Sequence, residues 1–431
     1  MARIVLTCWG SHGDIDPFLG LGLALGRRGH RVAIATLEYY RTLIEGAGLA
    51  FHPLRPEIDP TDTSLVHRIM DRRRGSEFLL REILFPQIEA MFDDVSAAAS
   101  QADLLVSHPV TFATPIVAER RGLPWASAVL APTSMFSTYD FPAVPPAPWV
   151  KSLERLGRWP GKLVVGVARR ETRKWAKPLY EFRERVGLGE GGNPVLEGQH
   201  SPHLVLALYS RLLGDPQPDW PPHTVITGHV FHDAPHGVLL APRLEAFLQD
   251  GPPPVVFTLG SSVVLIARDF WRQSVDAARR VGARAVLLAG SGLAAELDAV
   301  FGGERSERDV IAVDRAPHSL IFPRSSVVVQ QCGIGTMAQG LRSGRPMLAV
   351  PYSHDQPDNA LRAKRLGVAR VVYPPRYRAA RVARELDTLL SDPRYASSAA
   401  SVAAGIRNEG GAEAACDAIE QTFLNRTAHS M

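Results

Sequence analysis

An acidic, glycine-containing turn near the amino terminus has residue types that could take part in chemistry. It reads Gly10-Ser-His-Gly-Asp-Ile-Asp-Pro17. Asp16 directly precedes Pro17 and is the better candidate for a helix cap, which leaves the Asp14 carboxylate free to accept a proton from a substrate hydroxyl. His12 is a competing base. The alternatives are that Asp14 itself caps the helix and that His12 is an ordinary exposed turn residue.

Two later turns contain the small residues that suit an anion. The stretch Phe257-Thr-Leu-Gly-Ser-Ser262 offers backbone N–H groups to a phosphate, with an ordinary strand-to-helix turn as the alternative. In Gln330-Gln-Cys-Gly-Ile-Gly-Thr336, two glycines permit close approach of a ligand. A helix expected to begin near Thr336 would present unpaired N–H groups to the same ligand. The glycine spacing is not G-x-G-x-x-G, which disfavours a dinucleotide site.

A fourth polar turn follows the predicted strand 347–350. It reads Pro351-Tyr-Ser-His-Asp-Gln-Pro-Asp-Asn-Ala360. Asp355, Gln356 and Asn359 supply the hydrogen-bond donors and acceptors that suit sugar hydroxyls. The alternative is a capped helix start, for which an aspartate of this turn would provide the cap.

All four turns follow short apolar runs that alternate with helical patterns. This alternation predicts an α/β protein made of two tandem, doubly wound, Rossmann-like domains that face a cleft. The composition shift around residues 232–253 predicts domains at 1–235 and 236–409, with a last helix in 410–431 that returns to the first domain. The predicted strands are 3–9, 31–36, 103–107, 125–130, 254–259, 283–289, 310–313, 327–329, 347–350 and 368–372.

Composition narrows the function classes. The 431 residues carry a net charge of only +4, which is too dilute to indicate a nucleic-acid surface. Cys8, Cys332 and Cys416 are far apart, which excludes a zinc ribbon or a disulfide scaffold and suits a reducing cytoplasm. No signal peptide and no apolar window of about 18 residues are evident.

One segment has a much higher density of positive charge than the rest of the chain. Residues 151–177 hold nine Lys or Arg against two acidic residues, a local net charge of +7, and the segment also contains Trp159 and Trp175. It suits peripheral contact with an anionic membrane surface, and a solvated basic helix is the somewhat favoured alternative. The preceding Tyr139–Trp149 stretch, rich in proline and aromatic residues, is expected to shape an apolar acceptor pocket.

The sequence resembles the family 1 glycosyltransferases of the GT-B fold over nearly its whole length. The resemblance looks closest to the bacterial branch with the rhamnosyltransferase catalytic chain of rhamnolipid synthesis, with sterol, macrolide and glycopeptide enzymes more distant. The stretches that carry it are Trp9-Gly-Ser-His-Gly-Asp-Ile-Asp-Pro-Phe18, Val256-Phe-Thr-Leu-Gly-Ser261 and His354-Asp-Gln-Pro-Asp-Asn-Ala360.

The resemblance implies that the first domain binds the acceptor and the second the donor, with Asp14 as general base. The predicted acceptor contacts are Ser11, Phe136 and Tyr139. The donor contacts that the resemblance implies are Ser261, Arg315, Pro317, Gln331, Gly333, Gly335, Thr336, Asp355, Gln356 and Asn359. Arg315 stands where plant members stack a tryptophan on the nucleobase, and Gln330 and Gln331 stand where members usually have a histidine that contacts the diphosphate.

The expected function is therefore inverting, metal-independent transfer of a sugar, rhamnose or another hexose, from a dTDP- or UDP-sugar to a hydroxyl of an apolar small-molecule or lipid acceptor. The nucleotide-sugar is a co-substrate, and no cofactor, metal or nucleic acid is expected. The expected location is the cytoplasm, with the inner membrane as a peripheral contact. Two alternatives remain: a nucleotide-sugar epimerase of the same fold, and a non-catalytic binding or auxiliary protein that lacks the diphosphate-contacting histidines.

Overall fold

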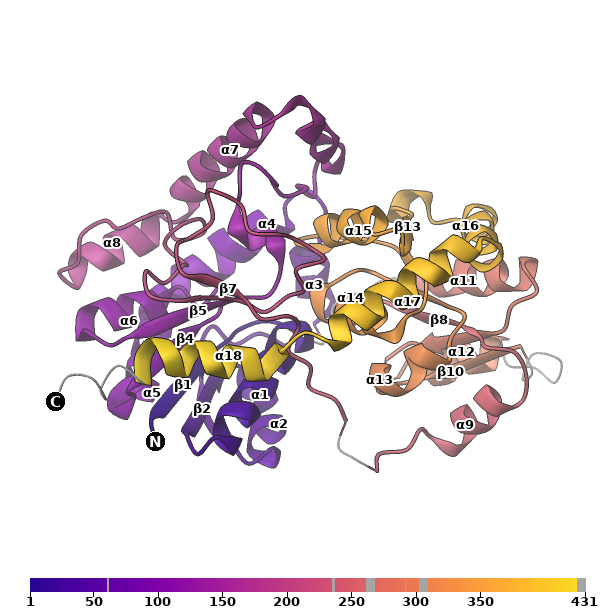
Figure 1. Ribbon diagram of the computed structural model, residues 1–431, viewed down its shortest axis with the longest axis horizontal. Coiled ribbons are helices and arrows are strands. Elements are labelled where there is room, and N and C mark those ends of the chain that lie inside the picture. The colour runs from indigo at the N-terminus through magenta and orange to yellow at the C-terminus, as the bar shows by residue number, and fades with distance from the viewer. Residues whose placement is uncertain (60–61, 235–236, 261–267, 291, 302–308, 425–431) are drawn as a thin grey trace. The chain divides into compact units, whose positions relative to one another are not determined.

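The computed structural model describes residues 1–59, 62–234, 237–260, 268–290, 292–301 and 309–424 (Figure 1). Two compact units divide the chain. Unit 1 comprises Met1–Asp59, Arg74–His232 and Glu409–Met431, and unit 2 comprises Pro60–Arg73 and Asp233–Asn408. Each unit contains one sheet whose paired strands all run parallel, so the α/β, Rossmann-like prediction is confirmed for both.

The sheet of unit 1 has seven strands in the order β3-β2-β1-β4-β5-β6-β7. Four of the strands were predicted from their buried apolar runs. The other three were missed because each is only three or four residues long and none alternates clearly. The strands are β1 Arg3–Thr7, β2 Arg31–Thr36, β3 Ala50–Pro53, β4 Leu104–Ser107, β5 Trp125–Val129, β6 Val205–Ala207 and β7 Thr224–Ile226.

Helices connect these strands, and the last helices of the chain pack against the first helix, α1. Arg28, at the end of α1, forms ion pairs with Glu413, Asp417 and Glu420 of the last helices at 2.6–2.9 Å. The helices of unit 1 are α1 His12–Arg27, η1 Glu38–Tyr40, α2 Arg41–Gly46, α4 Gly75–Phe78, η2 Leu79–Leu84, η3 Phe85–Gln87, α5 Ile88–Ala98, η4 Ala99–Gln101, α6 Ala113–Arg121, η5 Pro132–Met135, η6 Pro148–Leu156, α7 Trp159–Trp175, α8 Lys177–Arg185, α18 Gly411–Ile419 and η9 Glu420–Leu424.

The sheet of unit 2 has six strands in the order β10-β9-β8-β11-β12-β13. All six were predicted. They are β8 Val255–Thr258, β9 Ala285–Leu288, β10 Val310–Val313, β11 Val327–Gln330, β12 Met347–Ala349 and β13 Ala369–Val371. The helices are α3 Thr63–Ile69, α9 Pro242–Gln249, α11 Arg268–Arg280, α12 Ala294–Phe301, α13 His318–Ile321, η7 Phe322–Arg324, α14 Ile334–Ser343, α15 Gln356–Arg365, η8 Pro374–Arg376, α16 Ala379–Ser391 and α17 Pro393–Arg407.

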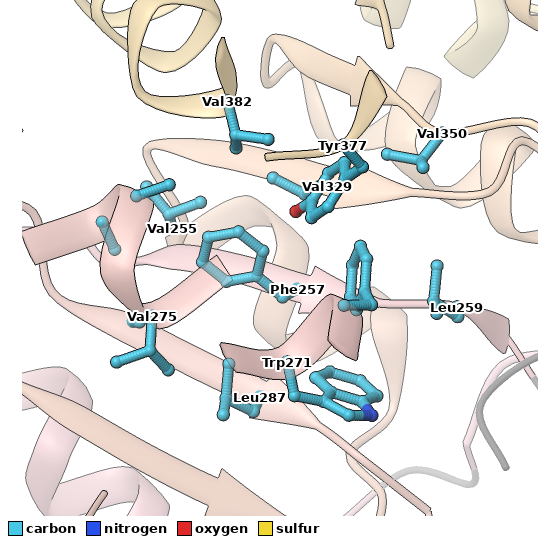
Figure 2. Close-up of a cluster of buried hydrophobic side chains, with 14 of the residues drawn as sticks. Val255, Phe257, Leu259, Trp271, Val275, Leu287, Val329, Val350, Tyr377 and Val382 are labelled. Carbon is cyan, nitrogen blue, oxygen red and sulfur yellow. The ribbon is translucent and has the colours of Figure 1, made fainter. Parts of the chain in front are cut away.

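A dense apolar cluster holds β8 in place. Figure 2 shows Phe257 of β8 between the helices that pack on this face, with Trp271 and Tyr377 close by. The Phe270 and Tyr377 rings stack at 4.7 Å, and the Tyr377 hydroxyl lies 2.8 Å from Ser274 Oγ. Burial of each large apolar side chain stabilises the fold by about 1.5–3 kcal/mol, so the strand end that leads to Gly260 is firmly fixed.

Unit 2 also includes a short piece of chain from far upstream. Val66 and Met70, in and just after α3, belong to the same buried cluster as β8. Ser353 Oγ donates a hydrogen bond to the Asp71 carbonyl at 3.0 Å. The sequence did not indicate this insertion, because residues 60–73 lie well inside the predicted first domain.

Candidate active site

In each unit, considered by itself, the strand order of the sheet reverses at one place. In unit 1 the chain moves outward from β1 to β3 and then starts again beside β1 with β4, and in unit 2 the same reversal lies between β8 and β11. Ligands of open parallel sheets bind beyond the carboxyl ends of the strands at such reversals. The polar turns predicted from the sequence after β1, β8 and β11 therefore lie at the two expected places.

Asp14 occupies the first turn of α1, which starts earlier than predicted. Ser11 is the N-cap residue, in an extended conformation, and the helix begins at His12. The Asp14 carboxylate accepts hydrogen bonds from the Ser11 N–H at 2.8 Å and from Ser11 Oγ at 3.1 Å. The choice of Asp16 as the cap was therefore wrong, because Pro17 lies inside the helix and Asp14 forms the reciprocal contact of a capping box.

The second carboxylate oxygen of Asp14 faces a histidine. His108 Nε2 lies 3.5 Å from Asp14 Oδ1, across the reversal between β1 and β4. The His108 side chain is buried, whereas about a third of the Asp14 side chain is exposed to solvent. The Val110 N–H lies 3.5 Å from His108 Nδ1, which favours the tautomer with its proton on Nε2, facing Asp14.

A buried hydroxyl network fixes the backbone at His108. Thr111 Oγ1 donates to the His108 carbonyl at 2.8 Å, and the same hydroxyl lies 3.0 Å from Thr7 Oγ1. The His108 ring packs edge-on against Phe18. His108 was not predicted as a site residue. The available signal was its position directly after the predicted strand 103–107, which becomes informative only once β4 is known to pair with β1.

Electrostatics keep Asp14 ionised. Burial raises the pKa of Asp14, but hydrogen bonding and charge attraction from His108, together with the two bonds from Ser11, outweigh it and leave the pKa below its usual value. At neutral pH the group is a carboxylate, and about a third of its side chain is exposed to solvent. It can therefore accept a proton from a hydroxyl placed against it.

The competing base lies apart from this pair. His12 Nδ1 is 3.6 Å from Asp16 Oδ1, and its ring contacts Tyr40 edge-on at 5.1 Å. His12 and Asp14 both lie in the first turn of α1, but the His12 ring faces Asp16 rather than Asp14. The geometry thus pairs Asp14 with His108 and His12 with Asp16.

The predicted acceptor contacts follow β1 and β5. Ser11 caps α1, as described. Phe136 lies just after β5, half-buried and with a positive φ of 48°. Tyr139 is exposed beneath the Arg158 guanidinium, which lies 4.4 Å from the ring centroid. Asp219 fixes this loop by accepting from Ser137 Oγ at 2.6 Å.

In unit 2, Gly260 and Gln331 meet at the reversal between β8 and β11. Gly260 has a φ of +62°, and a Cβ there would lie 2.1 Å from Gln331 Nε2. Gln331 Oε1 is buried without a hydrogen-bond partner among the described residues. Gln330, in contrast, points into the core, where its Nε2 contacts Met347 Sδ at 3.1 Å. Of the two glutamines, only Gln331 lies beside the turn after β8.

The helix after β11 begins slightly earlier than predicted. Gly333 is the N-cap residue and Ile334 the first helical residue, so Gly335 and Thr336 fall in the first turn of α14. The N–H groups of a first turn have no partners within their own helix. These residues therefore present backbone donors at the same edge of the sheet as Gln331.

Asn359 connects the turns after β11 and β12. Its Nδ2 donates to the Cys332 carbonyl at 3.0 Å and to Asp355 Oδ2 at 2.6 Å. Asp355 occupies the N-cap position of α15, but its side chain caps no backbone N–H there. Gln356 Oε1 accepts from the Tyr352 N–H at 2.8 Å, which leaves the amide nitrogen of Gln356 as a donor.

The remaining predicted donor contacts are not joined to this cluster. Arg315 and Pro317 follow β10, which is separated from β8 by β9. Pro317 is the N-cap residue of α13, and Arg315 is exposed with no ion-pair partner within the described residues. Ser261 lies outside the residues that the structure describes.

Comparisons with known proteins identify the family of the chain. Residues 4–135 match the glycosyltransferase family 28 N-terminal domain. The chain is 34% identical to O-mycaminosyltylonolide 6-deoxyallosyltransferase of Streptomyces fradiae, with 99% of both chains covered. It is 26% identical to the sterol 3-beta-glucosyltransferase UGT80A2 of Arabidopsis thaliana, with 96% of this chain and 65% of that protein covered.

The fold has solved counterparts. One is the glycosyltransferase VinC in complex with DTDP, with a TM-score of 0.68 at 20% identity and coverage of 98% of this chain and 100% of that one. This likeness concerns the fold, whereas the identity to the S. fradiae enzyme extends along the whole sequence. With its two Rossmann-like units, the chain belongs to the GT-B-fold glycosyltransferases and is an enzyme of that family.

Proposed function

We propose that this glycosyltransferase moves a sugar from a dTDP- or UDP-sugar to a hydroxyl of an apolar small-molecule or lipid acceptor, with inversion at the anomeric carbon and without a metal ion. The observation that carries the proposal is the ionised Asp14 held between Ser11 and His108 at the strand reversal of unit 1. In this scheme unit 1, which contains most of the predicted acceptor domain but not residues 60–73, binds the acceptor, and unit 2 binds the donor.

Asp14 acts as the general base. It takes the proton from the acceptor hydroxyl as that oxygen forms a bond to the anomeric carbon, while the bond from the same carbon to the diphosphate breaks. Ser11 holds one carboxylate oxygen and His108 Nε2 faces the other, so the group keeps its orientation during the step. His108 is a positioning residue in this scheme.

The leaving group is a nucleoside diphosphate, which carries the charge that develops. The first-turn N–H groups of α14 and the neutral amide of Gln331 stabilise it, and Ser261 is a further predicted contact. Asp355, Gln356 and Asn359 bind the sugar hydroxyls. Asn359 is buried and donates to the Cys332 carbonyl and to Asp355, so its part in this predicted contact is to hold the Asp355 carboxylate in place. Arg315 and Pro317 are assigned to the nucleobase by their place after β10.

The relatives favour a thymidine donor and a large apolar acceptor. VinC was solved with DTDP, and the S. fradiae enzyme is named as a 6-deoxyallosyltransferase of O-mycaminosyltylonolide. The exposed ring of Tyr139, one of the three predicted acceptor residues, agrees with an apolar aglycone. Rhamnose as the transferred sugar stays a prediction from the sequence resemblance.

The test measures nucleoside diphosphate release from a panel of dTDP- and UDP-sugars, with and without macrolide, sterol, phenolic and hydroxy-fatty-acid acceptors. Acceptor-dependent release, a product with the opposite anomeric configuration by NMR, and full rate in EDTA are expected. Conversion of the donor to its epimer without an acceptor would instead identify an epimerase. Absence of binding to every nucleoside diphosphate by calorimetry would contradict the donor assignment.

A further inference from the structure

Helix α7 carries apolar side chains on the face that is exposed to solvent. Trp159, Leu163 and Val167 recur every four residues, so they form one stripe, and each is more than half exposed. Val165, on the opposite face, is buried. A surface helix of a globular protein normally shows the reverse pattern, with polar residues on its outer face. Figure 1 shows α7 along the outer edge of unit 1.

The preceding helix η6, Pro148–Leu156, also carries exposed apolar side chains. Trp149 and Leu156 are also more than half exposed. We refer to Trp149, Leu156, Trp159, Leu163 and Val167 together as the α7 patch. Clustered exposed apolar residues of this size, especially tryptophans beside cations, mark an interaction surface rather than ordinary surface composition.

The positive charges of the segment divide into two groups. In the second half of α7, Arg169 pairs with Glu197 at 2.6 Å and Lys174 with Glu171 at 2.7 Å. Around Trp159, in contrast, Arg155, Arg158 and Lys162 have no carboxylate partner within the described residues. The Arg158 guanidinium contacts the neutral Thr138 hydroxyl and the Tyr139 ring, so its charge is not balanced by an anion among those residues. The uncompensated cations therefore lie at the apolar stripe, which the sequence count over 151–177 could not reveal.

The inner face of α7 is anchored to its own unit. A Cβ at Gly161 would lie 2.1 Å from the Thr138 carbonyl, so the helix backbone contacts that loop directly. At the other end, Asn193 Nδ2 donates to the Arg169 carbonyl at 3.1 Å and to Thr172 Oγ1 at 2.9 Å. The outward stripe is thus part of a fixed helix.

We propose that the α7 patch is a peripheral binding surface for an anionic lipid bilayer. Tryptophan and leucine enter the interface between headgroups and acyl chains, and the unpaired cations beside them attract anionic headgroups. A second copy of the chain is a poorer occupant, since an isologous contact would bring Arg155, Arg158 and Lys162 against the same cations of the other copy. In the described parts of the chain, no helix has the length and apolar character to cross a bilayer.

Co-flotation of the full chain with vesicles tests the proposal. Vesicles of phosphatidylcholine alone are compared with vesicles that contain about 30% phosphatidylglycerol, in about 0.15 M NaCl. The wild type should float with the anionic vesicles and be released by about 1 M salt. The double variant Lys162→Gln, Leu163→Ser should reduce the bound fraction at least about tenfold, because it removes one apolar anchor and one unpaired cation.

Matched controls separate this surface from general stickiness. Lys174→Gln changes a cation of the same helix that is already paired, and Leu390→Ser changes an exposed leucine of α16. Both should bind like the wild type. Transfer to a water-soluble acceptor without vesicles should be unchanged in every variant, so a failure of the proposed chemistry is seen independently of flotation.

Three results would overturn the proposal. They are absence of the wild type from the anionic vesicle fraction, equal flotation with the neutral vesicles, and equal binding of the double variant. A wild-type dimer in sedimentation that Leu163→Ser dissociates would instead assign the patch to a second copy.

Discussion

Replacement of Asp14 by asparagine separates its chemistry from its structural role. The amide oxygen of the new side chain can still accept from the Ser11 N–H, so half of the capping contact survives. What is lost is the negative charge at the helix start, worth about 0.3–1 kcal/mol, and the attraction to His108, which is modest because a third of the Asp14 side chain is exposed. Together the loss of stability should be about 1–2 kcal/mol.

The expected loss of activity is larger. Removal of a general base lowers the rate by about 10²–10⁴, which corresponds to roughly 3–5.5 kcal/mol of transition-state free energy. A protein of ordinary stability, about 5–15 kcal/mol, stays folded after Asp14→Asn, so the two effects can be measured on the same sample. We expect kcat to fall by this factor while the dissociation constant of the nucleoside diphosphate is unchanged.

The assay combines steady-state nucleoside diphosphate release with urea denaturation. Asp16→Asn is the matched control, since it makes the same chemical change two residues away at a carboxylate that faces His12. It should leave kcat within about twofold, as exposed ion pairs contribute little. Turnover of Asp14→Asn within about threefold of the wild type would refute the assignment of Asp14 as base and direct attention to His12.

Four further outcomes are expected. His108→Gln should lower kcat by about tenfold with little change in the acceptor KM, as measured by acceptor titration. If KM instead rises by a larger factor than kcat falls, the positioning role is contradicted. Gln331→His should tighten dTDP or UDP binding about fivefold at pH values below roughly 6.5 and not above, because only the imidazolium makes a charge-assisted bond to phosphate; calorimetry at two pH values checks this. Gly260→Ala should weaken donor binding by several-fold, because the new methyl group displaces the Gln331 amide. It should also lower the free energy of unfolding by about 1 kcal/mol, because φ is +62° at this position. Donor affinity equal to that of the wild type would contradict a donor site beside Gly260. The pKa of Asp14 is lower in the native state than in the unfolded state, where it is about 3.9. The ionised group therefore stabilises the fold fully above that unfolded value, and this stabilisation is lost as the pH falls through the native pKa. Below about pH 4, the urea midpoint of Asp14→Asn should decline less than that of the wild type.

Most strands could be predicted from the sequence because a buried strand is a short continuous run of apolar residues. The strands of unit 2 are short runs rich in apolar residues, and β8, β9 and β11 are buried throughout, so each could be found from its composition. The polar turns after β8, β11 and β12 could be placed at one edge for the same reason. The short strand β7 gave no such signal, since its residues are only partly buried at the sheet edge.

The site itself was less predictable, for two physical reasons. Ser11 and Asp14 fit the capping-box spacing, but the preference of proline for the first helical turn directed the choice of cap to Asp16. His108 is 94 residues from Asp14 in sequence, and only the pairing of β1 with β4 brings them within 3.5 Å. Gln331 alone was predicted as a donor contact, and the structure places it beside the turn after β8, whereas Gln330, the last residue of β11, points into the core.

The insertion of α3 into unit 2 limits how enzymes of this kind can be recombined. A single crossover near residue 235 would leave Val66 and Met70 with the amino-terminal parent and remove them from the core that they help to fill. It would also transfer residues 409–431 away from their partner Arg28. A functional hybrid of two parents therefore needs four junctions, at 59/60, 73/74, 232/233 and 408/409, so that each core is inherited whole.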